Sequence, residues 1–137
     1  MANEKVEFIK KGDELLAIII KSDYSGQVPE FFTPEHYPQQ VGFILKKKGD
    51  VIKAHNHKRI KREIDLTQEV LIIRKGRVEV TLYDGSNEHY DTRILEQGDI
   101  ILLTGGGHRY FALEDLEMVE IKQGPYLGKD DKVIFEK

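Results

Sequence analysis

The chain has 137 residues, the size of a single domain. Its net charge of -3 does not suggest nucleic-acid binding, and the absence of cysteine excludes disulfides and thiolate metal sites. No apolar stretch reaches the roughly 18 residues that span a bilayer, and the first residues lack the basic and apolar parts of a signal peptide. We therefore expect a cytoplasmic globular protein that binds neither membranes nor nucleic acid.

Short apolar runs separated by glycine and charged residues dominate the sequence. The expected strands are 6–10, 15–21, 41–45, 51–57, 69–74, 77–83, 90–95, 99–103, 108–113 and 116–122, with 133–135 as a candidate final strand. The continuous apolar run 15–20 is typical of a strand buried on both faces. Residues 22–40 hold three of the four prolines and several aromatics, which predicts an ordered loop. Many short strands with turn signals between them predict an all-β sandwich or barrel.

Three residues that commonly bind metals lie within the stretch 49–76. His55 and His57 are two positions apart in an expected strand, and side chains i and i+2 leave the same face of a strand. The two imidazoles can therefore converge on one ion. Glu69, at the start of the next apolar run, could supply a carboxylate.

Two motifs in this chain resemble those of the cupin superfamily. The first is Gly49-x5-His55-x-His57 followed by Glu69-x6-Gly76, and the second runs from Gly98 to His108. The resemblance covers about residues 49–112. It implies a double-stranded β-helix, or jelly-roll barrel, over 49–137, with residues 1–48 as N-terminal strands and a proline-rich loop of the same domain. Because small cupins often pair through such strands, it also implies a homodimer.

The resemblance implies that His55, His57, Glu69 and His108 hold a divalent metal. Fe, Mn, Ni, Co, Cu or Zn would suit such a set, because imidazole and carboxylate ligands do not choose sharply among these ions. Four protein ligands on an octahedral ion leave positions open for substrate or water. The alternative interpretation is a polar cluster that holds no metal.

The sequence departs from the cupin pattern in three ways. The eleven residues 58–68 separate His57 from Glu69, where the family usually has only a few. If this loop bends inward, Gln68, Asp65 or Glu63 could replace Glu69 as the ligand. Thr104 stands in place of the proline of the second motif, which is one residue short, and the three glycines before His108 can absorb that difference. The asparagine that often follows the second motif is absent.

Alternation along the expected strands adds two candidate catalytic residues. Tyr110 would face inward with His108, and its hydroxyl could orient a substrate or donate a proton. The alternative is a core or rim tyrosine. Lys53 would face inward with His55 and could bind an anionic substrate or lie at the solvated rim of the barrel.

The run Lys58-Arg59-Ile60-Lys61-Arg62 has four cations in five positions. Arg59 and Arg62 are candidate substrate-binding residues, because such a field attracts a carboxylate or phosphate. An ordinary solvated loop is the alternative.

Three functions remain open at this point, and the sequence does not decide whether the protein is an enzyme. The first is a metal-dependent reaction, of isomerase or oxygenase type, on a small anionic or sugar-like molecule. The second is non-catalytic binding of a small ligand. The third is a metal-free sugar epimerase or ketoisomerase, which would use a histidine and a tyrosine in the same barrel.

Overall fold

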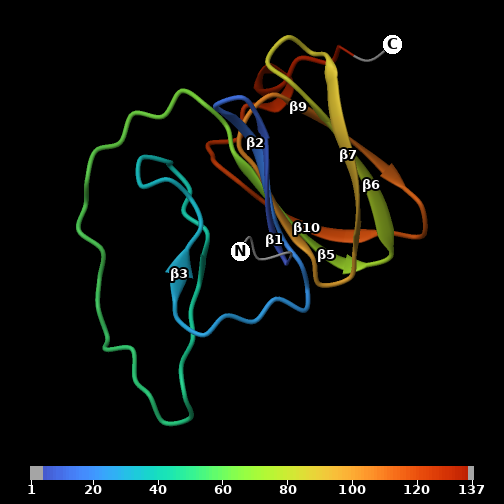
Figure 1. Ribbon diagram of the computed structural model, residues 1–137. Helices are drawn as coiled ribbons and strands as arrows, with labels where there is room; N and C mark the ends of the chain where they lie inside the picture. The colour runs from blue at the N-terminus through green and yellow to red at the C-terminus, as the bar shows by residue number, and fades with distance from the viewer. Residues whose placement is uncertain (1–4, 136–137) are drawn as a thin grey trace. The chain divides into compact units, whose positions relative to one another are not determined.

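The computed structural model describes residues 5–135. The chain divides into two compact units: Met1–Tyr24 together with Thr67–Lys137, here called the β-body, and Ser25–Leu66, here called the 25–66 segment (Figure 1). The described residues contain no helix long and apolar enough to cross a lipid bilayer.

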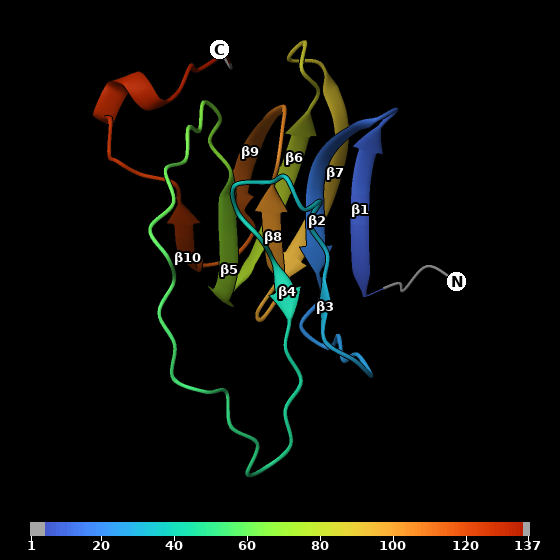
Figure 2. The ribbon, with the colours of Figure 1, turned by 90° about the vertical axis from the view of Figure 1, so that its left-hand side faces the viewer.

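The described part of the β-body consists of strands and one short 3-10 turn, η1 (Gly128–Asp131). Its strands are β1 (Val6–Lys11), β2 (Glu14–Ile20), β5 (Glu69–Lys75), β6 (Arg77–Tyr83), β7 (His89–Glu96), β8 (Ile100–Leu103), β9 (Gly107–Ala112) and β10 (Glu117–Lys122). They form a five-stranded antiparallel sheet in the order β1-β2-β8-β5-β10, which Figure 2 shows side by side. The second sheet has the order β7-β6-β9 (Figure 2).

The two sheets of the β-body share one hydrophobic core. Alternate residues of each strand point to the same face, so every second residue enters it. The core cluster contains Ile9, Ala17, Ile19, Leu71, Ile73, Val78, Val80, Leu82, Leu95, Ile101 and Leu103. Burying each large side chain of this kind stabilises the fold by about 1.5–3 kcal/mol. The sheets therefore pack face to face.

Strand β2 is buried on both faces, as its continuous apolar run predicts. Leu16, Ala17, Ile18 and Ile19 are consecutive, and none is more than 1% exposed. The strand pairs with β1 on one side and with β8 on the other.

A buried carboxylate joins the end of β2 to the turn before β8. Asp99 is fully buried and accepts hydrogen bonds from the backbone N–H groups of Ser22 and Glu96, both at 2.9 Å. Lys21 Nζ donates a third hydrogen bond at 2.8 Å. Each polar atom of this carboxylate thus has a partner, as burial of a charge requires.

Ion pairs link β1 to the three-stranded sheet. Arg93 on β7 donates from Nε and Nη2 to the two oxygens of Glu7, each at 2.9 Å. Lys11 pairs with the buried carboxylate of Asp84, just beyond β6. The hydrogen bond from Lys11, with others from backbone N–H groups, lowers the pKa of Asp84 to about 2.

Most of the expected strands of the β-body are confirmed to within one or two residues. The all-β prediction is also confirmed, but the described part of the β-body forms two open sheets, and no closed barrel is found among the described residues. The expectation of a strand at 133–135 is wrong, since these residues form no regular structure.

The 25–66 segment has little regular structure. Its strands β3 (Glu30–Phe31) and β4 (Gly42–Phe43) pair over two residues each. Between them the loop is ordered as expected: Thr33 Oγ1 donates to Gln40 Oε1 at 2.8 Å, and Gln40 Nε2 donates to the Tyr37 carbonyl at 2.8 Å.

The predicted strand 51–57 does not form. Residues 44–66 are exposed throughout and contain neither strand nor helix. The reason is visible in the alternation: Lys53, His55 and His57 would share one face, with Ala54 and Asn56 on the other. Neither face offers enough apolar surface to offset the entropy of ordering the chain.

Candidate functional site

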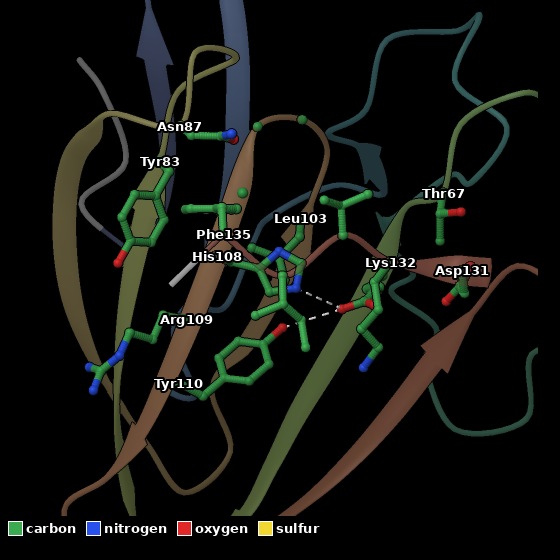
Figure 3. Close-up of a pocket in the computed structure, with 16 residues that line it drawn as sticks. Thr67, Tyr83, Asn87, Leu103, His108, Arg109, Tyr110, Asp131, Lys132 and Phe135 are labelled. Carbon is green, nitrogen blue, oxygen red and sulfur yellow. Dashed lines mark hydrogen bonds and ion pairs between the residues drawn. The ribbon is translucent and has the colours of Figure 1, made fainter. Parts of the chain in front are cut away.

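The β-body contains a cavity of about 620 Å³ (Figure 3). Its lining comes from the start of β5, the ends of β6 and β8, the start of β9 and the stretch 131–135. The lining residues are Thr67, Glu69, Tyr83, Asn87, Leu103, Gly105, Gly106, Gly107, His108, Arg109, Tyr110, Asp131, Lys132, Val133, Ile134 and Phe135.

Three polar side chains enter this cavity from strands that otherwise supply the core. Glu69 has the same parity on β5 as the buried Leu71, so it points to the core side of its sheet. On β9, His108 pairs in register with Leu82, and Tyr110 pairs with Val80. Paired residues share a face, so both rings also point inward. The sequence thus places polar groups where the apolar core ends.

The three side chains meet at one carboxylate oxygen. Glu69 Oε2 lies 3.3 Å from His108 Nε2 and accepts a hydrogen bond from the Tyr110 hydroxyl at 3.3 Å (dashed lines in Figure 3). The rings of His108 and Tyr110 stack, with centroids 5.2 Å apart. The Glu69 side chain is 16% exposed and that of His108 30% exposed, so the contact is shielded but reachable from solvent.

This environment sets the charge of two of the groups. The hydrogen bond from His108 lowers the pKa of Glu69, against the opposing effect of burial, so the carboxylate is ionised at neutral pH. Burial, followed by the negative charge of Glu69, raises the pKa of Tyr110 well above its usual range. Tyr110 therefore keeps its proton and can act as a hydrogen-bond donor.

The donor atoms of His108 and Glu69 fit a divalent transition metal. Two ligands each about 2.1 Å from an ion lie about 3.0 Å apart in octahedral geometry and about 3.4 Å apart in tetrahedral geometry. The observed Nε2···Oε2 separation of 3.3 Å lies in this range. Within the described residues 5–135, however, neither unit contains by itself a group of three His, Asp or Glu side chains that could hold a metal.

The other candidate residues from the sequence lie in the 25–66 segment. Its exposed part contains Lys53, His55, His57, Arg59 and Arg62. The rings of the two histidines are 5.3 Å apart, and His55 Nδ1 is 2.7 Å from the Lys53 carbonyl oxygen. Membership of these residues in one site with Glu69 and His108 stays a prediction.

Among the four candidates for the remaining ligand, Glu69 is the one that contacts His108 within the described residues. Gln68 is buried, and its backbone N–H donates to Gln123 Oε1 at 2.6 Å. Glu63 and Asp65 are exposed residues of the 25–66 segment.

Sequence reasoning did not find the contribution of residues 131–135 to the cavity. The stretch lacks motif residues, and its place depends on packing against β6 and β9. The one local sign is Gly107, whose missing side chain leaves room for an aromatic ring.

Comparison with known proteins gives no match to a family model, to a curated protein or to a solved structure. The resemblance to cupins therefore rests on the residues of the two sequence motifs.

Proposed function

We propose that the cavity of the β-body binds a small anionic or sugar-like molecule for an isomerase- or oxygenase-type reaction that depends on a divalent transition metal. The observation that supports this proposal is the contact of Glu69 Oε2 with both His108 Nε2 and the Tyr110 hydroxyl. A cavity of about 620 Å³ has the size of typical small-molecule sites. The sequence motifs extend the proposal to a cupin jelly roll, to a homodimer and to His55 and His57 as further ligands.

Each residue has a defined role in this proposal. His108 and Glu69 hold the metal, which when bound supplies Lewis-acid chemistry to a substrate oxygen. Tyr110, which retains its proton, donates a hydrogen bond to the substrate or gives up the proton as a general acid. The apolar wall at Leu103, which is 4% exposed, limits the access of water.

The same contact favours a second candidate, a metal-free epimerase or ketoisomerase. A carboxylate in contact with an imidazole nitrogen orients the ring. His108 would then remove a proton next to a carbonyl group, and Tyr110 would protonate the oxygen. Glu69 would act as the positioning residue for both.

Elemental analysis of the full chain, purified without chelator, separates the two candidates. The metal-dependent reaction requires roughly one equivalent of metal per chain, because each chain would hold one ion at one site. His108→Ala and Glu69→Gln should each lose the metal. His89→Ala, which changes an exposed histidine on β7, should retain it.

Metal-free wild-type protein that isomerises sugar substrates would contradict the first candidate and support the second. In that case His108→Ala and Tyr110→Phe should each abolish turnover. Thermal stabilisation by a small ligand without turnover under any metal would instead support a binding protein, the third function that the sequence allows.

The part played by the 25–66 segment has its own test. If His55 and His57 are ligands, His55→Ala and His57→Ala should each lower the metal content. Unchanged content would remove them from the ligand set and leave His108 and Glu69 in it.

A further inference from the structure

A short stretch of the β-body, residues 131–135, forms one side of the cavity. We call it the C-terminal strap. Strand β10 ends at Lys122, which lies opposite Glu69 in the β5–β10 register. The chain then passes through the turn η1, whose last residue, Asp131, is the first residue of the strap. All five strap residues line the cavity (Figure 3).

One end of the strap is tied to the five-stranded sheet. Lys122 Nζ donates to Asp131 Oδ2 at 3.1 Å, and the Asp131 side chain is 16% exposed. The hydrogen bond with Asp131 raises the pKa of Lys122, so the lysine keeps its charge at neutral pH. This contact holds the first residue of the strap beside the end of β10.

The other end of the strap rests on the three-stranded sheet. The ring of Phe135 meets that of Tyr83 edge to face, with centroids 5.0 Å apart. A Cβ atom built on Gly107 would lie 2.9 Å from two carbons of the Phe135 ring, closer than real Cβ contacts come. The ring therefore sits directly on the backbone of Gly107, at the start of the strand that carries His108.

Between these ends the strap borders the cavity on its solvent side. Lys132, Val133 and Ile134 line the cavity, yet Val133 is 86% exposed and Ile134 80% exposed. Side chains that are in contact with both a cavity and bulk water form its outer wall. Their position depends on what holds the two ends.

We propose that Phe135 is a positioning residue that latches the C-terminal strap across the cavity and so controls access to His108. Release of its ring from Gly107 and Tyr83 opens the outer wall; its seating closes the wall. This inference rests on the proposed function only in that it concerns the same cavity. It adds a regulated entrance, with Phe135 setting which ligands reach the contact of Glu69, His108 and Tyr110.

Chemical modification of histidine measures this access without a substrate. The full chain, dialysed against chelator so that no metal masks the imidazole, is treated with diethyl pyrocarbonate. Mass spectrometry then gives the modification rate of His108 relative to that of His36, an exposed histidine of the 25–66 segment. All samples are treated at one pH, and the ratio cancels differences in reagent concentration.

Phe135→Ala should raise this ratio roughly threefold or more, because reactivity follows the population of the open form. Gly107→Ala should do the same, since the added methyl group occupies the seat of the ring. Phe135→Tyr keeps an aromatic ring and should restore the wild-type ratio. Leu127→Ala, at an exposed residue before the strap that does not line the cavity, should leave the ratio unchanged.

An unchanged ratio in Phe135→Ala, in protein whose circular dichroism and melting temperature match wild type, would overturn the proposal. If Gly107→Ala does not fold, Phe135→Ala and its comparison with Phe135→Tyr still decide the matter. Metal content is measured on the same samples. A protein that never binds metal but shows the rise would refute the metal-dependent reaction and support the latch.

Discussion

The β-body and the 25–66 segment differ in the extent of their strand pairing and in the burial of their side chains. In the described part of the β-body, each strand is hydrogen-bonded to a neighbour, most strands have a buried apolar face, and β2 is buried on both sides. In the 25–66 segment, pairing extends over two residues, and residues 44–66 are exposed. Alternation of residue types therefore makes a strand only where a neighbouring strand and a buried face also exist.

The candidate functional residues divide in the same way. Glu69, His108 and Tyr110 come from paired strands, and their contacts are defined. The two remaining histidines come from the exposed stretch.

The largest difference is expected between two isoleucines. Ile101 is fully buried in the core cluster, so Ile101→Ala should lower the free energy of unfolding by about 3–4 kcal/mol, through lost burial and the cavity that remains. Ile60 is 62% exposed, and Ile60→Ala should change it by less than about 0.5 kcal/mol. Urea unfolding followed by circular dichroism measures both. Equal losses would show that the core is not where stability resides.

Two aspartates give the next largest contrast. Asp99→Ala leaves two backbone N–H groups and Lys21 without their buried acceptor and should cost about 2–3 kcal/mol. In the 25–66 segment, the exposed Asp50 accepts one hydrogen bond from the Lys47 N–H at 2.9 Å. Asp50→Ala should cost at most about 1 kcal/mol. The same urea titrations apply, and a larger effect at Asp50 would reverse the comparison.

A dependence on pH should belong to the β-body. The pKa of Asp84 is about 2 in the folded protein, below its usual value of 3.8. A carboxyl group whose pKa falls on folding contributes stability above the unfolded pKa and loses it as pH falls toward the folded one. Wild type should therefore lose stability more steeply than Asp84→Asn between pH 4 and pH 2. Parallel urea midpoints for the two proteins over that window would contradict this assignment.

The smallest contrast is between two ion pairs. Glu7 and Arg93 are partly exposed but bidentate, so a double-mutant cycle with Glu7→Gln and Arg93→Gln should give a coupling energy of about 0.5–1 kcal/mol. The pair Lys61–Glu63 in the 25–66 segment spans 3.6 Å and is 87% exposed at each side chain. Its cycle should give no measurable coupling, and a value equal to that of Glu7–Arg93 would refute the distinction.

Strands of the β-body could be predicted from the sequence because each combines local and global signals. The run 15–20 has apolar residues on both faces, and 77–83 alternates Val78, Val80 and Leu82 between polar positions. Residues 51–57 alternate as well, but their alternating side chains are mostly polar. Burial would therefore contribute too little free energy to hold this stretch as a strand. The strand predicted at 51–57 is therefore wrong, because the alternation alone does not show whether a partner strand exists.

The part of the candidate site that depends on the alternation of side chains along a strand could be predicted from the sequence. Alternation from His108 placed Tyr110 in the cavity, and the motif spacing placed Glu69 at the start of a strand. The role of Phe135 could not be found in this way. It depends on the absence of a side chain at Gly107 and on the ring of Tyr83, which lie far away in the sequence.

The order of strands has a consequence for the distance between Glu69 and His108. Glu69 is hydrogen-bonded in register between Leu103 of β8 and Lys122 of β10, so its backbone is held on both sides. His108 lies on β9, an edge strand with one neighbour in its sheet. A small outward displacement of β9 would carry His108 and Tyr110 together away from a carboxylate that does not move. The position of Glu69 is thus fixed by two neighbouring strands, whereas His108 can shift with β9. A displacement of this edge strand would change the 3.3 Å distance between Glu69 Oε2 and His108 Nε2.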